Sequence, residues 1–355
     1  MHLFRILLLP FSWIYCAVTA IRNKMFDFGI LRSQEYDIPI ISVGNITVGG
    51  TGKTPVTEFL LGLLQASKRC ATLSRGYGRK TKGVIISDAN ASYQSIGDEP
   101  MQMKLKFPSV CVAVAEKRRE GMEKLLALPD SPQVVILDDA FQHRYVKPGL
   151  SIVVIDYNRP VRKDFCLPAG NLRESVSGLN RADVILINKC PEDLSRSEAD
   201  SIRSKLKLSS HQQLFFSSIS YKEPVCMGAQ NTESFKSRIK ENNKLLVAVA
   251  GIGNPEPFFE SLKQYKLPLE TLSFRDHHSY GIADLRKIEK LGQQTDSLRP
   301  EIITTEKDAI RIASIRGLSE SLKNRLWYVP ISLNFIFNEQ NLFEEKVIDY
   351  VEKYN

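Results

Sequence analysis

The sequence contains few of the residues from which metal sites and disulfide frameworks are built. Its 355 residues include six cysteines and five histidines. No two cysteines form a Cys-x-x-Cys pair, and no group of cysteines and histidines has the spacing of a zinc site. These absences exclude a zinc-binding module and a disulfide-stapled secreted domain. We expect each cysteine to be a small core residue in a reducing, cytosolic environment.

The charged residues form no long block of one sign. The formal net charge is +8, but no basic stripe interleaved with aromatic residues runs along the chain. Such a stripe is typical of nucleic-acid-binding proteins, so we expect no nucleic-acid partner. A positive balance favours other anionic partners, such as a phosphorylated lipid or an acidic membrane surface. Internal repeats and low-complexity segments are also absent, and nothing indicates an obligate protein partner.

From residue 38 to about residue 218, apolar runs of strand length alternate with amphipathic stretches. Most runs are continuous in Val, Ile and Leu, as expected of strands that are covered on both faces. Residues 56–64 place their apolar side chains on one face of a helix. This alternation predicts a parallel, doubly wound α/β domain. The expected strands are Ile38–Val43, Cys70–Ser74, Val84–Ile86, Val110–Val114, Val134–Leu137, Ile152–Ile155, Val184–Ile187 and Leu214–Ser217.

A smaller α/β unit is expected to follow. Leu245–Ala250, Glu301–Thr305 and Leu326–Ile331 have strand patterns, and Pro255 stands near the start of a helix. A last amphipathic helix covers about Asn341–Lys353. The predicted domains are residues 26–220, residues 221–335 with a strand linker, and a C-terminal helix in residues 336–355, with residues 1–25 set apart.

A glycine-rich loop between the first expected strand and the first expected helix predicts a nucleotide site. Its glycines let the backbone turn N–H groups toward phosphate oxygens, and the helix presents its positive N-terminal end to them. Lys53 is expected to pair with the β- and γ-phosphates of ATP, and Thr54 to give its hydroxyl to Mg²⁺. Threonine replaces the usual first glycine of the pattern, but the strand–loop–helix context outweighs a mere glycine-rich turn. The predicted loop is Thr47, Val48, Gly49, Gly50, Thr51, Gly52, Lys53 and Thr54.

The expected strand Val134–Leu137 is followed directly by Asp138 and Asp139. An acid at the carboxyl end of a strand beside a P-loop reaches the Mg²⁺ sphere in enzymes of this kind. Taken alone, these residues would read as solvated strand-end aspartates. Beside a P-loop, we expect both to hold magnesium.

Signatures of other P-loop classes are absent. Asn188-Lys189-Cys190-Pro191 begins like the guanine-reading motif of GTPases but has proline where that motif needs aspartate. ATPases with an additional signature lysine place it just before two glycines, where this chain has Val48. A small-molecule kinase or a synthetase-like enzyme remains. The expected fold class is α/β, a P-loop NTPase-type parallel sheet sandwich with a second, smaller α/β domain and an apolar N-terminal helix.

The N-terminal segment lacks an unbroken apolar run of spanning length. Leu3–Ala20 is nearly all apolar, but Pro10 breaks it, and a spanning helix needs about 20 apolar residues. A signal peptide has a similar shape, but export would separate an ATP-dependent site from its ATP. We favour a helix in the membrane interface over residues 1–25, with Trp13 and Tyr15 at headgroup depth. A buried terminal helix is the main alternative.

Several polar clusters are candidates for the chemistry of a kinase, which must orient an acceptor hydroxyl and ease loss of its proton. Gly97-Asp98-Glu99-Pro100 places two carboxylates in a predicted turn. Asp276-His277-His278 carries two of the five histidines. Gln142-His143-Arg144 follows the expected magnesium acids, and Arg173-Glu174 is either a phosphate-binding pair or a surface ion pair.

Blocks of sequence in a fixed order resemble one enzyme family. They are Val43–Pro55, Leu73–Arg79, Gly97–Pro100, Leu137–His143, Leu167–Glu174, Phe274–His278 and Thr305–Asp308. The set is similar to the tetraacyldisaccharide 4′-kinases of the lipid A pathway of Gram-negative bacteria, over nearly the whole chain. Two departures are small: Ala140 stands where glycine is usual, and Asn171 lies where proline is common.

This resemblance implies transfer of phosphate from ATP, with Mg²⁺, to the 4′-hydroxyl of a tetraacylated disaccharide 1-phosphate. It places the enzyme at the cytosolic face of the inner membrane, with two α/β/α domains joined by a strand linker and the nucleotide in their cleft. Asp98 and His277 match an aspartate–histidine dyad that serves as base, beside the catalytic Lys53. Asp138 and Asp139 match the acids that hold Mg-ATP. Supporting polar positions are matched by Glu99, Gln142, His143, Arg173, Glu174 and Asp276.

Two other functions stay open at this point. One is a soluble P-loop kinase of small molecules whose first 25 residues form a core helix. The other is a nucleotide-switched binding protein without lipid kinase activity, which would leave the Asp-Glu and Asp-His-His clusters unexplained. Phosphate transfer to a lipid acceptor separates the three.

Overall fold

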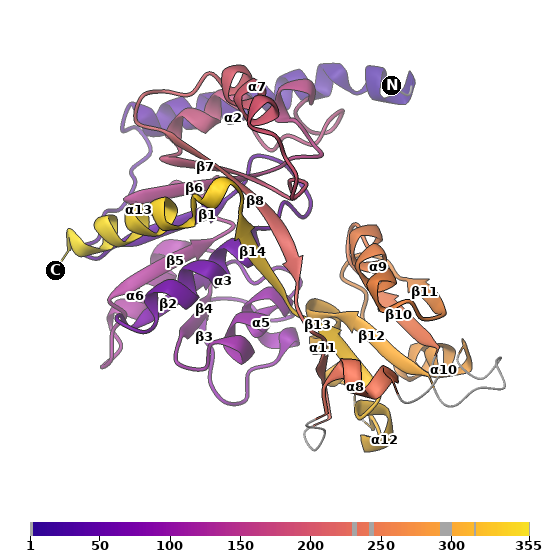
Figure 1. Cartoon of the computed structure of the whole chain (residues 1–355). Coiled ribbons are helices and arrows are strands. Elements are labelled where there is room, and N and C mark those ends of the chain that lie inside the picture. The colour runs from indigo at the N-terminus through magenta and orange to yellow at the C-terminus, as the bar shows by residue number, and fades with distance from the viewer. Residues whose placement is uncertain (1–2, 229–232, 241–244, 292–299, 316, 355) are drawn as a thin grey trace.

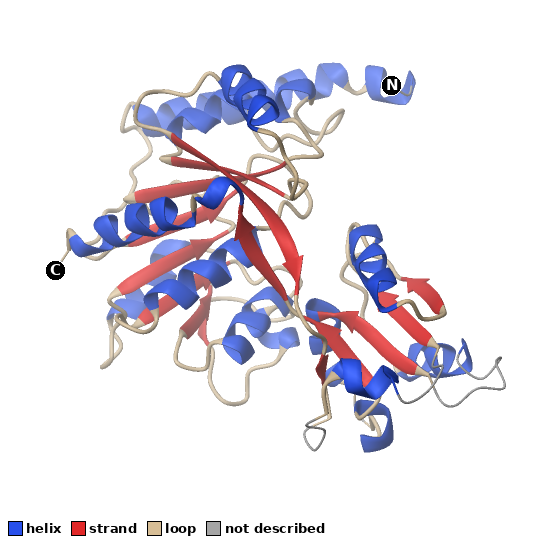
Figure 2. Ribbon diagram, viewed as in Figure 1, coloured by secondary structure: helices blue, strands red, loops and turns tan. Residues whose placement is uncertain are grey.

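The computed structural model describes residues 3–228, 233–240, 245–291, 300–315 and 317–354. The first two residues of the expected N-terminal helix and parts of the expected domain 221–335 lie outside the described residues. Within the described part, the chain forms a nine-stranded sheet and a five-stranded sheet, each flanked by helices (Figures 1 and 2). The predicted α/β fold with a second, smaller α/β unit is confirmed.

The larger sheet is parallel except at its edges. Its order is β14-β8-β7-β6-β1-β5-β2-β4-β3, and only β3 and β14 run antiparallel to their neighbours. The central strands are buried along their whole length, which explains their unbroken Val and Ile runs. The bounds are β1 Ile40–Gly44, β2 Cys70–Ser74, β3 Ile85–Ile86, β4 Cys111–Val114, β5 Val134–Asp138, β6 Leu150–Asp156, β7 Val184–Asn188, β8 Gln213–Tyr221 and β14 Ile331–Phe335.

Helices cover both faces of this sheet. On one face pack α3 (Lys53–Leu64), α4 (Tyr93–Ile96), α5 (Asp98–Lys106) and α13 (Gln340–Glu352). On the other pack α6 (Arg118–Leu126), α7 (Arg196–Leu206) and α2 (Leu9–Asp27). Alternate strand residues enter the two layers, so the sheet forms the middle of a sandwich.

The smaller sheet has the order β11-β10-β12-β13-β9 and is parallel apart from β9. Its strands are β9 Val225–Cys226, β10 Leu246–Ala250, β11 Leu269–Ser273, β12 Glu301–Thr305 and β13 Leu326–Val329. The helices α8 (Phe235–Lys240) and α9 (Glu256–Leu262) cover one face. The other face carries α10 (Ile282–Leu291), α11 (Glu306–Ala313) and α12 (Glu320–Lys323).

Two antiparallel strands carry the chain between the sheets, as Figure 1 shows for β8 and β14. Tyr221 at the end of β8 pairs with Ile331 at the start of β14, and the N–H of Lys222 donates to the carbonyl of Pro330 at 2.8 Å. The prediction of one strand over Leu326–Ile331 is therefore wrong. Pro330 has no N–H to continue a ladder, so the chain leaves β13 before it and enters β14 after it.

The apolar N-terminal segment is helical, with α1 over Leu3–Leu7 and α2 directly after it. Its outer face exposes apolar side chains: Trp13 is 66% exposed and Ile14 is 63% exposed. Of the helices in the described residues, none is both long enough and apolar enough to cross a bilayer.

Candidate functional site

The glycine-rich loop lies between β1 and α3, with the amino end of α3 at Lys53. Gly49 and Gly52 have φ angles of +87° and +93°, which strongly favour glycine. Thr51 is fully buried, and its Oγ1 accepts a hydrogen bond from Nδ2 of Asn45 at 3.1 Å. The loop therefore has the backbone turn that brings successive N–H groups to one side.

Lys53, Asp139 and Arg173 lie together at the end of β5. Oδ1 of Asp139 is 3.5 Å from Nζ of Lys53 and 2.7 Å from Nη1 of Arg173. Burial alone would raise the pKa of Asp139, but the two cations outweigh it and hold that pKa below its ordinary value. The two cations thus keep Asp139 ionised.

Asp138 is the last residue of β5 and is buried. Its Oδ1 accepts a hydrogen bond from the hydroxyl of Thr57 at 3.3 Å. Burial, together with repulsion from Glu99 and Asp139, raises the pKa of Asp138 to about 7. Thr57 lies one helical turn after Thr54 on α3, a spacing that is visible in the sequence.

No group of three or more His, Cys, Asp and Glu side chains in the described residues is arranged to hold a metal ion unaided. Of the residues expected to hold Mg²⁺, Thr54 offers a buried hydroxyl, and Asp138 and Asp139 offer carboxylates that are adjacent in the chain. This is a sparse, all-oxygen set.

The first carboxylate of the Asp-Glu cluster meets the first histidine of the Asp-His-His cluster. Oδ2 of Asp98 lies 2.9 Å from Nδ1 of His277 and also accepts a hydrogen bond from Nη2 of Arg311. Nη1 of Arg311 lies 3.0 Å from Oδ1 of Asp308. Asp98 begins α5 beside the large sheet, whereas the other three residues belong to the small unit.

These contacts set the protonation of the pair. Burial alone would raise the pKa of Asp98, but the hydrogen bond from His277 and the charges of Lys307 and Arg311 hold it well below its usual range. The same hydrogen bond raises the pKa of His277, against the effect of burial. The pair therefore favours a carboxylate beside an imidazolium.

Glu99 lies next to this pair and joins it to the loop. Its carboxylate binds the ammonium of Lys307, whose charge lowers the pKa of Glu99. Glu99 is also close enough to Asp138 to help raise the pKa of that acid, and to Lys53 to be affected by its charge. The dyad and the phosphate loop thus belong to one electrostatic cluster.

Sequence reasoning assigned no role to Lys307, Asp308 or Arg311. The signal was present, because Thr305–Asp308 was one of the matching blocks and Arg311 follows Asp308 at i+3. The hydroxyl of Thr305 caps α11 by accepting the N–H of Asp308 at 3.2 Å. The cap fixes the first turn of the helix, from which Lys307 and Asp308 extend.

A second ionic contact joins helices that flank the large sheet to a helix of the small unit. Nζ of Lys106 on α5 lies 2.7 Å from Oε2 of Glu58 on α3 and 3.3 Å from Oε2 of Glu306 on α11. Gln102 donates to the same two carboxylates, at 2.7 and 3.2 Å. Burial and Glu58 raise the pKa of Glu306 to about 7.

The N-terminal helix touches the site through its inner face. The hydroxyl of Tyr15 donates to the carbonyl of Arg173 at 3.0 Å, so the expectation that Tyr15 lies at headgroup depth is wrong. Nδ2 of Asn23 donates to Oε2 of Glu174 at 2.9 Å. Nε2 of Gln142 donates to Oε1 of Glu174, also at 2.9 Å. Gln142, Arg173 and Glu174 therefore lie between the helix and the loop.

Two supporting candidates lie at the margin of this cluster. Asp276 is exposed, and its Oδ1 is 3.9 Å from Nε2 of His277. His143 packs its ring 5.7 Å from that of Tyr145, and burial and the charge of Arg118 lower its pKa to about 4. His143 is thus a neutral imidazole near neutral pH.

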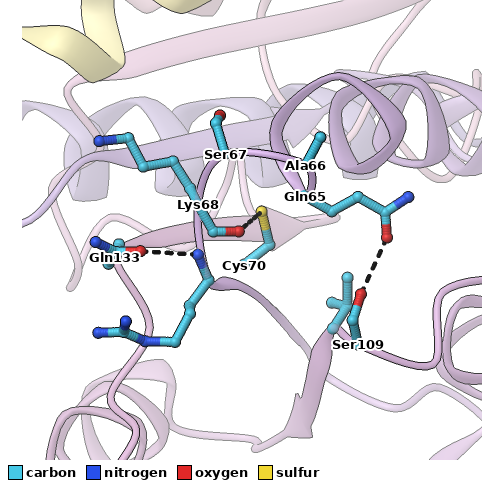
Figure 3. A pocket seen from close by; sticks show the side chains of 9 residues that line it. Gln65, Ala66, Ser67, Lys68, Cys70, Ser109 and Gln133 are labelled. Carbon is cyan, nitrogen blue, oxygen red and sulfur yellow. Dashed lines mark hydrogen bonds between the residues drawn. The ribbon is translucent and has the colours of Figure 1, made fainter.

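A cavity of about 260 Å³ lies away from all of these residues. Figure 3 shows the cavity around Cys70, the first residue of β2. There the hydroxyl of Ser109 donates to Oε1 of Gln65 at 3.2 Å. Because β1, β5 and β2 are parallel, the start of β2 is at the opposite edge of the sheet from the phosphate loop. This cavity is not part of the site.

Comparisons with known proteins agree on one family. Residues 4–352 match the family described as LpxK, tetraacyldisaccharide-1-P 4′-kinase. The chain is 45% identical to the tetraacyldisaccharide 4′-kinase of Bacteroides thetaiotaomicron, with 98% of this chain and 93% of the other covered. It is also 45% identical to that of Flavobacterium johnsoniae, with 99% of each covered. A crystal structure of the "apo" form of LpxK from Aquifex aeolicus in complex with ATP superposes with a TM-score of 0.75, at 30% identity, over 98% of this chain and 99% of that one.

Proposed function

This chain belongs to the tetraacyldisaccharide-1-P 4′-kinase family, and we propose that it transfers the γ-phosphoryl group of ATP to the 4′-hydroxyl of a tetraacyldisaccharide 1-phosphate, a step of lipid A biosynthesis. The observation that supports this most directly is the 2.9 Å contact between Asp98 and His277 beside a P-loop. An acid–base pair next to a phosphate cradle suits transfer to a hydroxyl group.

The phosphate loop and Lys53 hold the triphosphate in this proposal. Thr54, Asp138 and Asp139 are the residues that would hold Mg²⁺. The fit is good, because Mg²⁺ keeps several waters and takes only one or two carboxylates together with phosphate oxygens. The raised pKa of buried Asp138 also marks a carboxylate whose burial and acidic neighbours, Glu99 and Asp139, outweigh the nearby charge of Lys53. When bound, the ion neutralises charge on the phosphates.

Asp98, assisted by His277, takes the proton of the 4′-hydroxyl in this proposal. The sugar oxygen then forms its bond to the γ-phosphorus while the bond from that phosphorus to the ADP oxygen breaks. A carboxylate with a lowered pKa is a weak base, but a loose phosphoryl-transfer transition state needs little base strength. Arg311 holds Asp98 in place. Because Asp98 lies in the proposed domain 26–220 and His277 in the proposed domain 221–335, closure of the two assembles the pair.

The N-terminal helix is proposed to lie on the membrane. Leu7, Phe11, Trp13 and Ile14 are all more than 60% exposed, which is unusual for such side chains in a folded protein. Inserting them among lipid headgroups would bury them. The inner face of α2 contacts Arg173 and Glu174, so the site would stand close to the bilayer surface. The cytoplasmic face of the inner membrane of a Gram-negative bacterium supplies both the lipid and the ATP.

Labelled ATP tests the function. The chain is incubated with [γ-³²P]ATP, Mg²⁺ and the tetraacyldisaccharide 1-phosphate, and the lipids are extracted into organic solvent. We expect the label to appear on the lipid. An unlabelled lipid, together with label on a water-soluble sugar supplied in a parallel incubation, would indicate a soluble kinase. Slow hydrolysis of ATP without transfer would indicate a nucleotide switch.

A further inference from the structure

Asn188 and Lys189 begin like a guanine-reading motif but lack its aspartate, and the proposed reaction gives them no role. Asn188 ends β7 and is fully buried. Its Nδ2 donates to the carbonyl of Thr51 at 3.2 Å. Lys189 follows with a φ of +60°, and its ammonium donates to the carbonyl of Gly50. Both side chains therefore act on the phosphate loop.

Arg159 makes a third contact of the same kind. It stands three residues after the end of β6, the strand next to β7, and its Nη1 donates to the carbonyl of Val48 at 3.2 Å. Three side chains from the ends of two neighbouring strands thus bind the loop from Val48 to Thr51. Each one takes a backbone carbonyl.

The three donors are themselves fixed. Oδ2 of buried Asp156 lies 2.8 Å from Nζ of Lys189 and 3.5 Å from Nη2 of Arg159. Oδ1 of Asn188 accepts hydrogen bonds from the N–H of Lys189 at 2.8 Å and from the hydroxyl of Ser217 at 3.0 Å. These partners hold Asn188 and Lys189 against the phosphate loop.

Two glycines of the loop make room for these side chains. A Cβ atom on Gly52 would lie 2.0 Å from Nδ2 of Asn188, and one on Gly49 would lie 3.0 Å from Nη1 of Arg159. The glycines are therefore needed for contact with the donors as well as for their positive φ angles.

The amides of the loop are left for another partner. The N–H of Val48 donates to the carbonyl of Asn171 at 2.8 Å. The next four N–H groups, from Gly49 to Gly52, make no hydrogen bond to any residue that the structure describes. A loop whose carbonyls are held and whose successive amides are free is arranged to bind anionic oxygens.

We propose that Asn188, Lys189 and Arg159 are positioning residues that hold the carbonyls of the phosphate loop, so that its amides are oriented for ATP before ATP arrives. The inference rests on the proposed function in that the loop is taken to bind ATP. Donors that are already oriented need no rearrangement when charge develops on the phosphates. The Asn-Lys pair thus serves the phosphate end of the nucleotide rather than its base.

Lys189→Met tests the proposal, because it keeps the aliphatic stem and removes the ammonium. The dissociation constant of a fluorescent ATP analogue is measured without acceptor, and KM is measured for ATP and for the lipid during transfer. We expect the dissociation constant and the KM for ATP to rise about tenfold, as for loss of one charge-assisted hydrogen bond. The KM for the lipid should stay within about twofold of the parent value, because the change is local to the loop. Lys189→Arg keeps a cationic donor and should restore ATP affinity to within about threefold.

We expect Arg159→Met to raise the dissociation constant and the KM for ATP in the same way. Arg162→Met is its matched control. Nη2 of Arg162 donates to the carbonyl of Leu206 at 2.9 Å, away from the loop. If Lys189→Met and Arg159→Met fold and bind ATP within about twofold of the parent chain, the proposal is overturned. The proposal would also be overturned if Lys189→Met raised the KM for ATP and the KM for the lipid equally. The same holds if Arg162→Met weakened ATP binding as much as Arg159→Met does. A parent chain that binds no ATP would instead overturn the proposed function and this inference with it, so the two failures are distinguishable.

Discussion

Nδ1 of His277 lies 2.9 Å from Oδ2 of Asp98, although 179 residues separate the two in the chain. Asp98 opens a helix that packs on the large sheet, and His277 follows the edge strand of the small sheet. The pair therefore exists only while the two units face each other. Arg311 and Lys307 bind Asp98 and Glu99 across the same boundary.

Replacing Asp98 with alanine should stop the chemistry without removing ATP. We expect turnover to fall by about 10²- to 10⁴-fold, since a positioned proton acceptor contributes about that much. The affinity for ATP should change little, because Asp98 makes no contact with the phosphate loop. Single-turnover transfer and binding of a fluorescent ATP analogue measure the two quantities. Asp88→Ala is the control, because Asp88 is exposed and, among the described residues, its carboxylate accepts the N–H of Asn90 alone. Unchanged turnover in Asp98→Ala would remove this residue from the mechanism.

The contact between Asp98 and His277 should make stability depend on pH. The folded-state pKa of His277 is raised above 6.5, so its contribution is fully present below that pH. It is lost as the pH rises through the raised value. Because the His277 side chain is 36% exposed, the effect should be less than about 1 kcal/mol. The difference in Tm between the parent and His277→Gln, measured from acid to mildly alkaline pH, should shrink as the pH rises. A difference that grows with pH would contradict this sign.

Removing the cation between Glu58 and Glu306 should weaken the junction of the two units. Lys106→Met removes the ion pair of buried Glu58 and leaves Gln102 as its hydrogen-bond partner among the described residues. We expect the free energy of unfolding to fall by about 2–3 kcal/mol, as for a buried carboxylate that loses its counter-ion. Denaturant titration measures it. The control is Lys104→Met on the same helix, where the ammonium donates to the carbonyl of Ser87 at 3.5 Å and forms no ion pair with a described carboxylate. Lys104→Met should change the free energy of unfolding by no more than about 0.5 kcal/mol. Equal losses of stability in the two variants would argue against the ionic contact.

The exposed face of α2 should bind lipid. We expect Phe11→Ser combined with Trp13→Ser to lower partitioning into anionic vesicles by at least about tenfold, since each large apolar side chain contributes about 1.5–3 kcal/mol on burial. Co-sedimentation with vesicles of phosphatidylethanolamine and phosphatidylglycerol measures the partitioning. Leu342→Ser is the control, because Leu342 is also half exposed but lies on α13. Full retention of binding by the double variant would exclude α2 as the membrane contact.

The sequence was a good guide wherever burial was continuous. Cys70–Ser74 and Glu301–Thr305 were predicted with their observed bounds, because runs of buried residues leave little choice of register. The two-residue strand Val225–Cys226 was not predicted, because it has too few residues to show a pattern. At Pro330 the apolar run continued, but the missing N–H divided it between two sheets.

The residues of the candidate site also differ in whether the sequence alone could predict them. The phosphate loop and the two acids at the end of β5, Asp138 and Asp139, are local patterns, so the sequence alone predicted them. Asp98 and His277 were paired only through the resemblance, since no local rule relates residues so far apart. Arg311 was missed because a charge on a short helix usually faces solvent. It is buried here only because α11 packs against α5 across the junction.

The pairing of β8 with β14 begins next to the small sheet, with Tyr221 opposite Ile331. It continues to Ser217 opposite Phe335. The small sheet is thus inserted between the two strands of one antiparallel pair. Splicing a tight turn in place of residues 222–330 would join these two strands in a hairpin and leave all nine strands of the large sheet in one contiguous chain. That shortened chain would keep the phosphate loop and Asp98 but lose His277 and Arg311, which contact Asp98, and Lys307, which binds Glu99. The small unit is therefore an insertion at a single turn, and it completes a cluster of charges that the large unit begins.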